Sequence, residues 1–272
     1  MKRIFFGLLV FSLWLTPTPG LTQVVTAPVT QMAKSEYKSF LQLFMDYPQE
    51  SINRDEEGKV VVEFTADNTG RITDRNIARG VSPGIDSTAL AIFDYLLWKP
   101  GLSLGKKITC TSTYELNFDL KAFRRLVKKR GYLHVPQHYS PYDSSGTIFP
   151  MKKCETAPQF QLQDSGTSLA EFLNEHLNFP DNASKLGISG TVKLKFVVER
   201  NGLPSNIVVL EYIGGGCTEE AIRLLELTRW IPGMLDNQYV RTYFEINILF
   251  KKGENKDGHI PNQSNTGYCF LQ

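Results

Sequence analysis

Two histidines are the residues of this chain best spaced for metal chemistry. His134 and His138 lie four positions apart, and on a helix this spacing places two imidazoles one turn from each other, where they can bind zinc. Cys154 or Cys110 could supply a third ligand. Pro136 lies between the histidines and breaks the helix that the spacing requires. We therefore keep a zinc-dependent enzyme as a second alternative only, and we predict no metal and no cofactor.

The acidic clusters favour structural roles over acid and base catalysis. Glu219–Glu220 open a predicted helix, whose N-terminus favours negative charge, and 55–57 (Asp-Glu-Glu) lie in a predicted loop. No Glu follows His134 directly, as the zinc-protease pattern requires. The sequence thus predicts no catalytic residue, and a function that depends on binding.

Length and composition predict a folded protein of about two domains. The chain has 272 residues, 42% hydrophobic and 21% charged, which excludes collagen-like and mainly disordered proteins. Its formal net charge of +2 is too small to predict a nucleic-acid partner without a basic patch.

The N-terminus has the pattern of a secretory signal peptide. The basic residues Lys2 and Arg3 precede the uncharged apolar run Ile4–Leu15, and small residues follow up to Gly20. Twelve helical residues rise about 18 Å, less than the roughly 30 Å hydrocarbon layer. We expect residues 1–20 to be removed, so that the mature chain does not span a membrane. A retained N-terminal anchor is the alternative.

The chain contains an internal repeat at a shift of 132 residues. The shift aligns Trp98-x-Pro100-Gly101 with Trp230-x-Pro232-Gly233. A repeat of about 85 residues is longer than a solenoid unit and indicates a duplicated folding domain. We predict domains at 35–119 and 155–251, a linker with a basic helix at 120–154, and a polar tail at 252–272.

Both copies show the same order of periodicities. Apolar spacing of 3.6 residues predicts helices, and alternation predicts strands, with a hairpin turn at Asn201-Gly202 in the second copy. Each copy is then an α+β domain in which two helices pack on a small antiparallel three-stranded sheet. The predicted order of helix, strand, strand, helix, strand covers 168–177, 191–199, 205–212, 218–227 and 240–251, and earlier 37–44, 59–65, 72–79, 86–96 and 112–119.

The W-x-P-G motifs are expected to be structural. A buried tryptophan removes about 150 to 250 Å² of surface from water, and its truncation costs about 3 to 5 kcal/mol. We therefore expect Trp98, Pro100 and Gly101, and likewise Trp230, Pro232 and Gly233, to hold the two cores together.

The ordered set of motifs resembles the TonB C-terminal domain family, in two tandem copies. The resemblance implies a domain in the periplasm that binds a short segment of outer-membrane transporters and passes inner-membrane energy to them. The residues that carry it are Tyr47-Pro48, Gly58, Val60, Phe64, Gly70, Ala89, Trp98, Pro100, Gly101 and Phe118, then Phe179-Pro180, Gly190, Val192, Phe196, Gly202, Ala221, Trp230, Pro232, Gly233 and Phe250.

Energy transducers of this family combine a membrane anchor, a long Pro-rich spacer and one such domain. This chain has a short apolar run, no Pro-rich spacer and two copies. We therefore favour a soluble periplasmic TonB-like protein-binding module, whose partner is an outer-membrane transporter or another envelope protein. An N-terminally anchored transducer is the alternative.

Strand addition suits this role because an exposed final strand offers unpaired backbone groups to an extended peptide. Residues 112–116 form the equivalent strand of the first copy, and sequence does not decide which copy binds. An edge already covered is the opposing interpretation. The predicted docking residues are Thr242, Tyr243, Phe244, Glu245, Ile246, Asn247 and Ile248.

Four cysteines in an oxidising compartment favour disulfides over a metal site. Proximity along the chain favours pairing Cys110 with Cys154 and Cys217 with Cys269. Free thiols are the alternative.

The connector between the copies begins with a basic segment at 121–130, which we interpret as a solvated helix rather than a binder of anionic surfaces. Residues 132–150 have the composition of a linker. Their sequence does not predict how the two domains are oriented.

Overall fold

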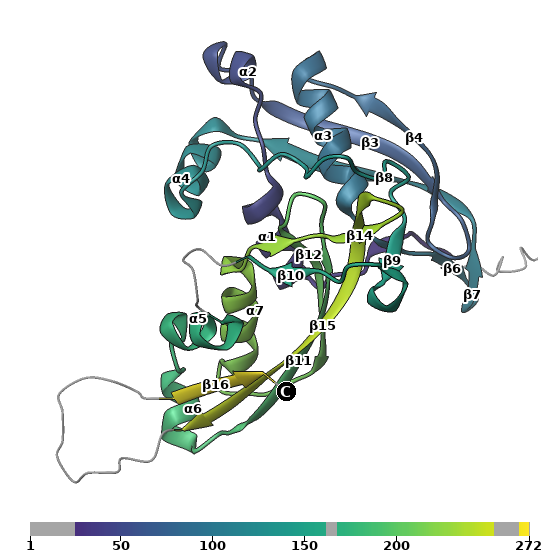
Figure 1. Cartoon of the computed structure of the whole chain (residues 1–272). Coiled ribbons are helices and arrows are strands. Elements are labelled where there is room, and N and C mark those ends of the chain that lie inside the picture. Colours follow the sequence, from purple (N-terminus) through teal and green to yellow (C-terminus); the bar gives the residue numbers. More distant parts are fainter. Residues whose placement is uncertain (1–24, 162–167, 253–266, 272) are drawn as a thin grey trace, which may run out of the picture.

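The computed structural model describes residues 25–161, 168–252 and the backbone of 267–271 (Figure 1). It contains two α+β copies. The first has a three-stranded antiparallel sheet of order β4-β3-β8, and the second has the same antiparallel core, β12-β11-β15, within a six-stranded sheet that also includes β14, β16 and the parallel strand β9. The predicted fold class is therefore confirmed. The predicted signal peptide lies outside the described residues.

The first copy follows the predicted order closely, and one short helix is added after Pro48. Three strands of eight or nine residues form its antiparallel sheet, and the long helix α3 packs on the central strand, β3. The elements are α1 (Lys34–Phe44), α2 (Gln49–Asn53), β3 (Gly58–Ala66), β4 (Ile72–Arg79), α3 (Pro83–Tyr95) and β8 (Cys110–Phe118).

The second copy repeats this arrangement, including the short helix after Pro180. A capping box between Ser168 and Glu171 begins its first helix. The elements are α5 (Leu169–His176), α6 (Asp181–Leu186), β11 (Gly190–Val198), β12 (Pro204–Glu211), α7 (Cys217–Leu227) and β15 (Gln238–Lys252).

Strand register confirms the duplication. Gly58 pairs with Phe118 in the first sheet, and Gly190 pairs with Phe250 in the second, 132 positions later. The first hairpin has a register irregularity after Val61, and the second has one after Lys193, again 132 positions later. Both the pairing and its irregularity are therefore conserved between the two copies.

Glycine is required at the hairpin turn of each copy because two backbones approach closely there. A Cβ at Gly70 would lie 2.1 Å from the Trp98 carbonyl oxygen, and one at Gly202 would lie 2.3 Å from that of Trp230. Both glycines also have positive φ, +90° and +77°. The turn and the tryptophan strand are thus packed backbone to backbone.

The W-x-P-G motifs form pairs of short strands that receive a strand from upstream. In the first copy these are β5 (Trp98–Lys99) and β6 (Gly101–Ser103), which pair with β2 (Val29–Thr30) and β1 (Val25–Thr26). In the second copy β13 (Trp230–Ile231) pairs with β10 (Gln159–Phe160). The first structural unit thus includes 25–30, upstream of the predicted boundary at residue 35.

Each tryptophan lies in a separate buried aromatic core. Trp98, 6% exposed, packs with Phe64 and Phe93 at ring centroid distances of 4.4 and 5.4 Å. Trp230, 1% exposed, packs with Phe196 and Phe244 at 5.6 and 5.0 Å. These contacts support the structural role predicted for both tryptophans.

The basic connector helix, α4 (Leu120–Arg130), packs on the first copy. Leu120 and Phe123 are buried in its core. At the other end of the helix, the Arg130 guanidinium donates hydrogen bonds to the carbonyl oxygens of Met45 and Leu133, at 2.7 and 2.6 Å. The apolar residues of this helix therefore pack largely on its own domain.

A buried ion pair within the second copy also contacts the first copy. Arg241, 3% exposed, donates from Nε and Nη2 to the Glu199 carboxylate at 2.8 and 2.7 Å. Its Nη2 also donates to the carbonyl oxygen of Tyr95 in the first copy, at 2.9 Å. Ser205 donates its hydroxyl to Glu199 as well. A charge from the second copy thus holds the end of α3.

Asn206 makes a second polar contact across the interface. Its side-chain amide donates to the Tyr95 carbonyl oxygen at 2.8 Å, and its oxygen accepts from the Leu97 backbone N–H at 3.1 Å. Leu203, on the same hairpin, is fully buried in the core of the first copy. The copies are therefore packed together and are not separated by an extended linker.

None of the helices in the described ranges is both long and apolar enough to cross a membrane.

We expect removal of one partner of the ion pair to destabilise the protein strongly. The variant Arg241→Met leaves the buried Glu199 carboxylate without its cation, which should lower the free energy of unfolding by about 3 to 5 kcal/mol. The double variant Arg241→Met/Glu199→Gln should recover most of this loss. Urea unfolding followed by tryptophan fluorescence measures both.

Arg75→Met is the matched control, because Arg75 pairs with Asp94 at the surface. Its loss should cost less than about 1 kcal/mol. Equal losses for the buried and the exposed arginine would contradict the role given to the buried pair.

Candidate protein-docking site

The final strand of the first copy has a free edge. All nine residues of β8 pair with β3, from Cys110 opposite Ala66 to Phe118 opposite Gly58. Among the described residues no strand pairs with its other edge (Figure 1). Such an edge presents a row of N–H and C=O groups to which an extended chain can bind.

The equivalent strand of the second copy is largely covered. The connector strand β9 (Ile148–Pro150) pairs in parallel with Arg241–Tyr243, and β16 (Gly267–Leu271) pairs antiparallel with Ile248–Lys252. The expectation that Thr242–Ile248 offers a continuous open edge is therefore wrong at both ends. Only Phe244–Asn247 lie between the two covering strands.

Side chains alternate along β8, as expected for a half-buried strand. Tyr114, Leu116 and Phe118 are buried, and the residues between them point to solvent. On the solvent face, Glu115 accepts a hydrogen bond from Lys59 at 2.7 Å. An added strand would thus extend both a polar outer face and an apolar inner face.

A pair of tyrosines lies beneath this strand. The hydroxyl groups of Tyr37, from α1, and Tyr114, from β8, are 2.8 Å apart. Burial raises the pKa of both phenols above the usual value. Both hydroxyls are protonated at neutral pH, as phenols ordinarily are, and can donate and accept hydrogen bonds.

The two buried tryptophans differ in hydrogen bonding: the indole N–H has an acceptor in the second copy and none in the first. The Trp230 Nε1–H donates to the Thr228 hydroxyl at 2.7 Å, whereas the buried Trp98 Nε1 has no hydrogen-bond partner. The residue equivalent to Thr228 is Leu96. Comparison of the two repeats could have revealed this difference from the sequence.

The residues of the zinc hypothesis do not come together. His134 Nδ1 lies 3.0 Å from Asp46, and His138 Nε2 lies 2.8 Å from the Tyr95 hydroxyl. The sulfur of Cys154 lies 3.6 Å from the Thr242 hydroxyl instead. Within the described ranges, no three His, Cys, Asp or Glu side chains form a metal-binding group.

Gly80–Gly84 has the G-x-S-x-G pattern of a nucleophile turn, and it joins a strand to a helix. It was not among the predicted site residues. Ser82 has ordinary extended backbone angles, and its hydroxyl donates to the Glu56 carboxylate at 2.7 Å. The hydrogen bonds from Ser82 and then Ser51 lower the pKa of Glu56, so this carboxylate favours its charged form as a hydrogen-bond acceptor.

The Cys110–Cys154 disulfide prediction is wrong, because both thiols are free. A Cβ at Gly101 would lie 2.4 Å from the sulfur of Cys110, and one at Gly233 would lie 3.1 Å from that of Cys154. Each sulfur therefore packs against the W-x-P-G strand of a different copy. Cys217 is free as well, and the side chain of Cys269 lies outside the described residues.

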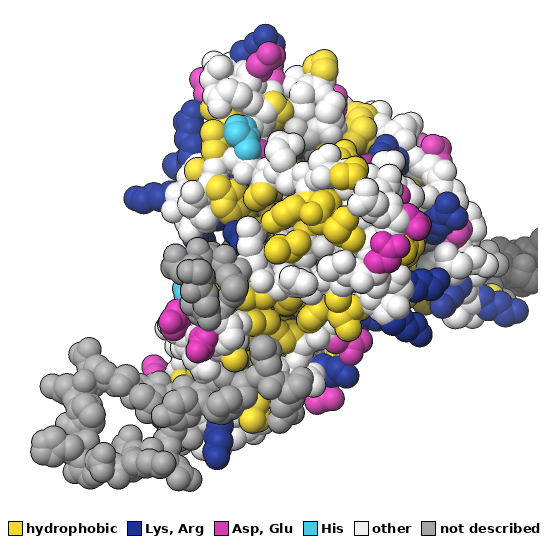
Figure 2. Space-filling model, viewed as in Figure 1, with side chains coloured by type: hydrophobic (Ala, Val, Ile, Leu, Met, Phe, Trp, Pro, Cys, Tyr) yellow, Lys and Arg dark blue, Asp and Glu magenta, His cyan; other side chains and the backbone are white. Residues whose placement is uncertain are grey.

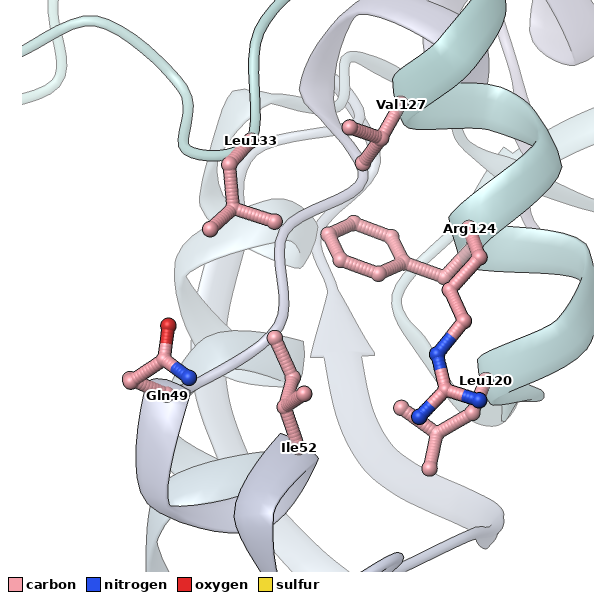
Figure 3. Close-up of a pocket in the computed structure, with 7 residues that line it drawn as sticks. Gln49, Ile52, Leu120, Arg124, Val127 and Leu133 are labelled. Carbon is pink, nitrogen blue, oxygen red and sulfur yellow. The ribbon is translucent and has the colours of Figure 1, made fainter.

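An apolar hollow of about 230 Å³ lies between α2, α4 and the segment that follows α4 (Figure 3). Figure 3 shows Ile52, Val127 and Leu133 around it, with Arg124 at one side. It lacks a set of convergent polar groups that would orient a small molecule.

These features describe a duplicated α+β domain whose first copy has a free strand edge. The sequence profile of the Gram-negative bacterial TonB protein C-terminal family matches residues 45–120 and 175–251. The chain therefore belongs to this family, in two copies, and is a TonB-like protein of the cell envelope. The family is related to transport and is not enzymatic. Searches of curated proteins and of solved structures found no match.

The free thiols predict a simple labelling result. In unfolded protein without reductant, Cys110 and Cys154 should each take up one alkyl group, as read by peptide mass spectrometry. A peptide pair joined through these two residues, and separated by reduction, would contradict the packing described above.

We expect the free energy of unfolding to fall in mild acid because of His138. Burial, and then the nearby Arg200 charge, lower the pKa of His138 below its usual 6.5. The unfolded state therefore takes up the proton first, and the contribution of neutral His138 is lost as pH falls below about 6.5. The variant His138→Gln should show a smaller loss of unfolding free energy between about pH 7 and pH 5.5. A loss equal to that of the parent protein would rule out this role.

Proposed function

We propose that this chain is a non-catalytic periplasmic binding protein that takes up an extended partner segment along the free edge of β8. The N-terminal signal peptide would direct its secretion. The proposed partner is an outer-membrane transporter or another envelope protein, since family membership indicates protein binding in the envelope.

The contrast between β8 and β15 carries the proposal. The two strands occupy equivalent positions, yet β15 receives β9 and β16 from its own chain, while β8 receives no such strand within the described residues. Strand addition is therefore an event that this fold already accommodates. In the first copy the added strand must come from another molecule or another segment.

The expected binding is weak and reversible. An added strand that makes about four to six backbone hydrogen bonds gains about 0.5 to 1.5 kcal/mol for each bond. Much of this gain is lost in ordering the peptide and restricting its motion. Alternate side chains of the peptide would set its preference, with Tyr114 and Leu116 on the inner face and Glu115 on the outer face.

An N-terminally anchored energy transducer is the second candidate, and it requires that the apolar run Ile4–Leu15 is retained. Both candidates use the β8 edge. They differ in the N-terminus of the protein in cells, because removal of residues 1–20 leaves no anchor. Mass spectrometry of the purified protein distinguishes them.

The free edge predicts site-dependent capture of a partner. A photoreactive residue in place of Thr113, on the exposed face of β8, should crosslink to an outer-membrane transporter in intact cells. The matched control is Glu245, which is also exposed and lies 132 positions later. Capture there should be much weaker, because only four residues of β15 lie between its covering strands.

Amide hydrogen exchange provides an independent measurement. A peptide that copies the captured segment should slow exchange at alternate amides of β8 and leave those of β15 unchanged. Stronger capture at Glu245, or protection confined to β15, would refute the choice of the first copy. Capture of no envelope protein at either position would refute the proposed class of partner.

A further inference from the structure

One hairpin of the first copy has a leucine at its tip, where the backbone conformation of the turn disfavours that residue. The hairpin consists of β6 and β7 (Lys106–Ile108), and its turn places Leu104 at φ 50° and Gly105 at φ 76°. This left-handed geometry belongs to the tight turns that favour Asn, Asp and Gly. Leucine is strained there because of its Cβ.

The second copy provides the comparison. The same hairpin, β14 (Gly233–Leu235) and the start of β15, turns through Asp236 and Asn237 at φ 50° and 58°. These are residues that the turn geometry favours. The fold thus forms without leucine at this position, so folding does not explain Leu104.

Leu104 is also strongly exposed. Its fractional exposure is 74%, the highest among the large hydrophobic residues of the described chain. Leu102, on β6, and Val25, on the paired strand β1, are 38% and 52% exposed. A strained leucine at the apex of an exposed apolar group indicates a surface that contacts something.

The surroundings of the tip are basic. Lys99, Lys106 and Lys107 are exposed, and neither 25–30 nor 98–108 contains an acidic residue. In the second copy the residues equivalent to Lys106 and Lys107 are Gln238 and Tyr239. Figure 2 shows Lys and Arg side chains gathered at the end of the molecule where Figure 1 labels β6 and β7.

The shape of the tip fits a bilayer better than a protein. A two-residue turn is convex and narrow, whereas a specific protein interface buries about 800 Å² on each partner. A membrane interface accepts a single apolar side chain at the level of the lipid headgroups, and nearby lysines bind anionic lipid phosphates.

The N-terminal end of the described chain lies beside this hairpin. The described chain begins at Val25, in the strand that pairs with β6, and the apolar run Ile4–Leu15 lies shortly before it in sequence. A contact made by the tip does not depend on the partner at β8.

We propose that the β6–β7 hairpin is a peripheral membrane contact, which inserts Leu104 among the headgroups of anionic phospholipids while the lysines bind their phosphates. The helix α4 lies on the other side of the molecule in Figure 1. Its basic residues are therefore not part of this surface and can serve as a control.

The first test reads insertion of the tip directly. The variants Leu104→Trp and Asp236→Trp place an additional tryptophan at equivalent turns. With vesicles of phosphatidylglycerol and brominated phosphatidylcholine, the fluorescence of Leu104→Trp should be quenched and that of Asp236→Trp should not. Equal quenching, or none in either variant, would overturn the proposal. The comparison holds whether or not the N-terminal apolar run is retained.

The second test uses protein whose mass shows that residues 1–20 are absent. Leu104→Asp should lower binding to phosphatidylglycerol vesicles at least about tenfold, because a leucine no longer enters the interface. Lys106→Glu/Lys107→Glu should lower it as well. The charge-matched control on α4, Lys121→Glu/Lys128→Glu, should keep most of the binding. If the α4 variant loses binding and the tip variants keep it, the proposal is wrong.

Leu104→Asp also separates binding from folding. Aspartate occupies this turn position in the second copy, so the thermal midpoint of the variant should not fall below that of the parent protein. Lost vesicle binding with an unchanged midpoint supports the proposal. A lowered midpoint would contradict the claim that the fold does not need Leu104.

Discussion

Backbone hydrogen bonding at the strand edges is the constraint on which this structure depends. A three-stranded sheet has two edges, and each edge leaves N–H and C=O groups that need a partner or water. In the second copy, β9 and β16 satisfy much of the β15 edge. The β8 edge of the first copy has no such cover among the described residues. Duplication has thus produced two domains of one fold whose edges differ in availability.

The interface between the copies explains why they have diverged. The second copy inserts its β11–β12 turn beneath the first, where Leu203 joins the first core and Glu199 binds Arg241. The positions equivalent to Glu199 and Arg241 in the first copy are Asp67 and Thr109. With Thr109 at the position of the arginine, the first copy cannot form the equivalent ion pair at its own turn. The first hairpin stays polar and exposed, while the second is buried.

The hairpin tips diverge in the same manner. The second copy turns through Asp236–Asn237, residues that the turn geometry favours, and the first copy has Leu104 at a strained position. The free edge of β8 begins two residues after the leucine hairpin ends. A membrane contact at the tip and a peptide contact along β8 would therefore act through one continuous segment of the first copy, and the second copy would support both.

Much of the fold could be predicted from the sequence because it depends on local periodicity and on the repeat. The strands at 190–198 and 72–79 and the helix at 217–227 fall within one residue of the predictions. The short helices after Pro48 and Pro180 were missed, since five or six residues give too little periodicity. The upstream strands were missed too, although Thr26-Ala27-Pro28 recurs as Thr156-Ala157-Pro158. That recurrence has a shift of 130, and the predicted repeat was followed only at 132.

The amino-acid sequence alone determined the α+β fold, its duplication and the family, because these follow from side-chain spacing that is the same in both copies. Only the tertiary structure decided which edge is free, that Cys110 and Cys154 remain unpaired, and how the copies pack. These outcomes depend on contacts between segments far apart in the chain, such as Arg241 with Tyr95 and β9 with β15. Spacing along the chain says nothing about such contacts, since the same strand pattern is compatible with a free edge and with a covered one.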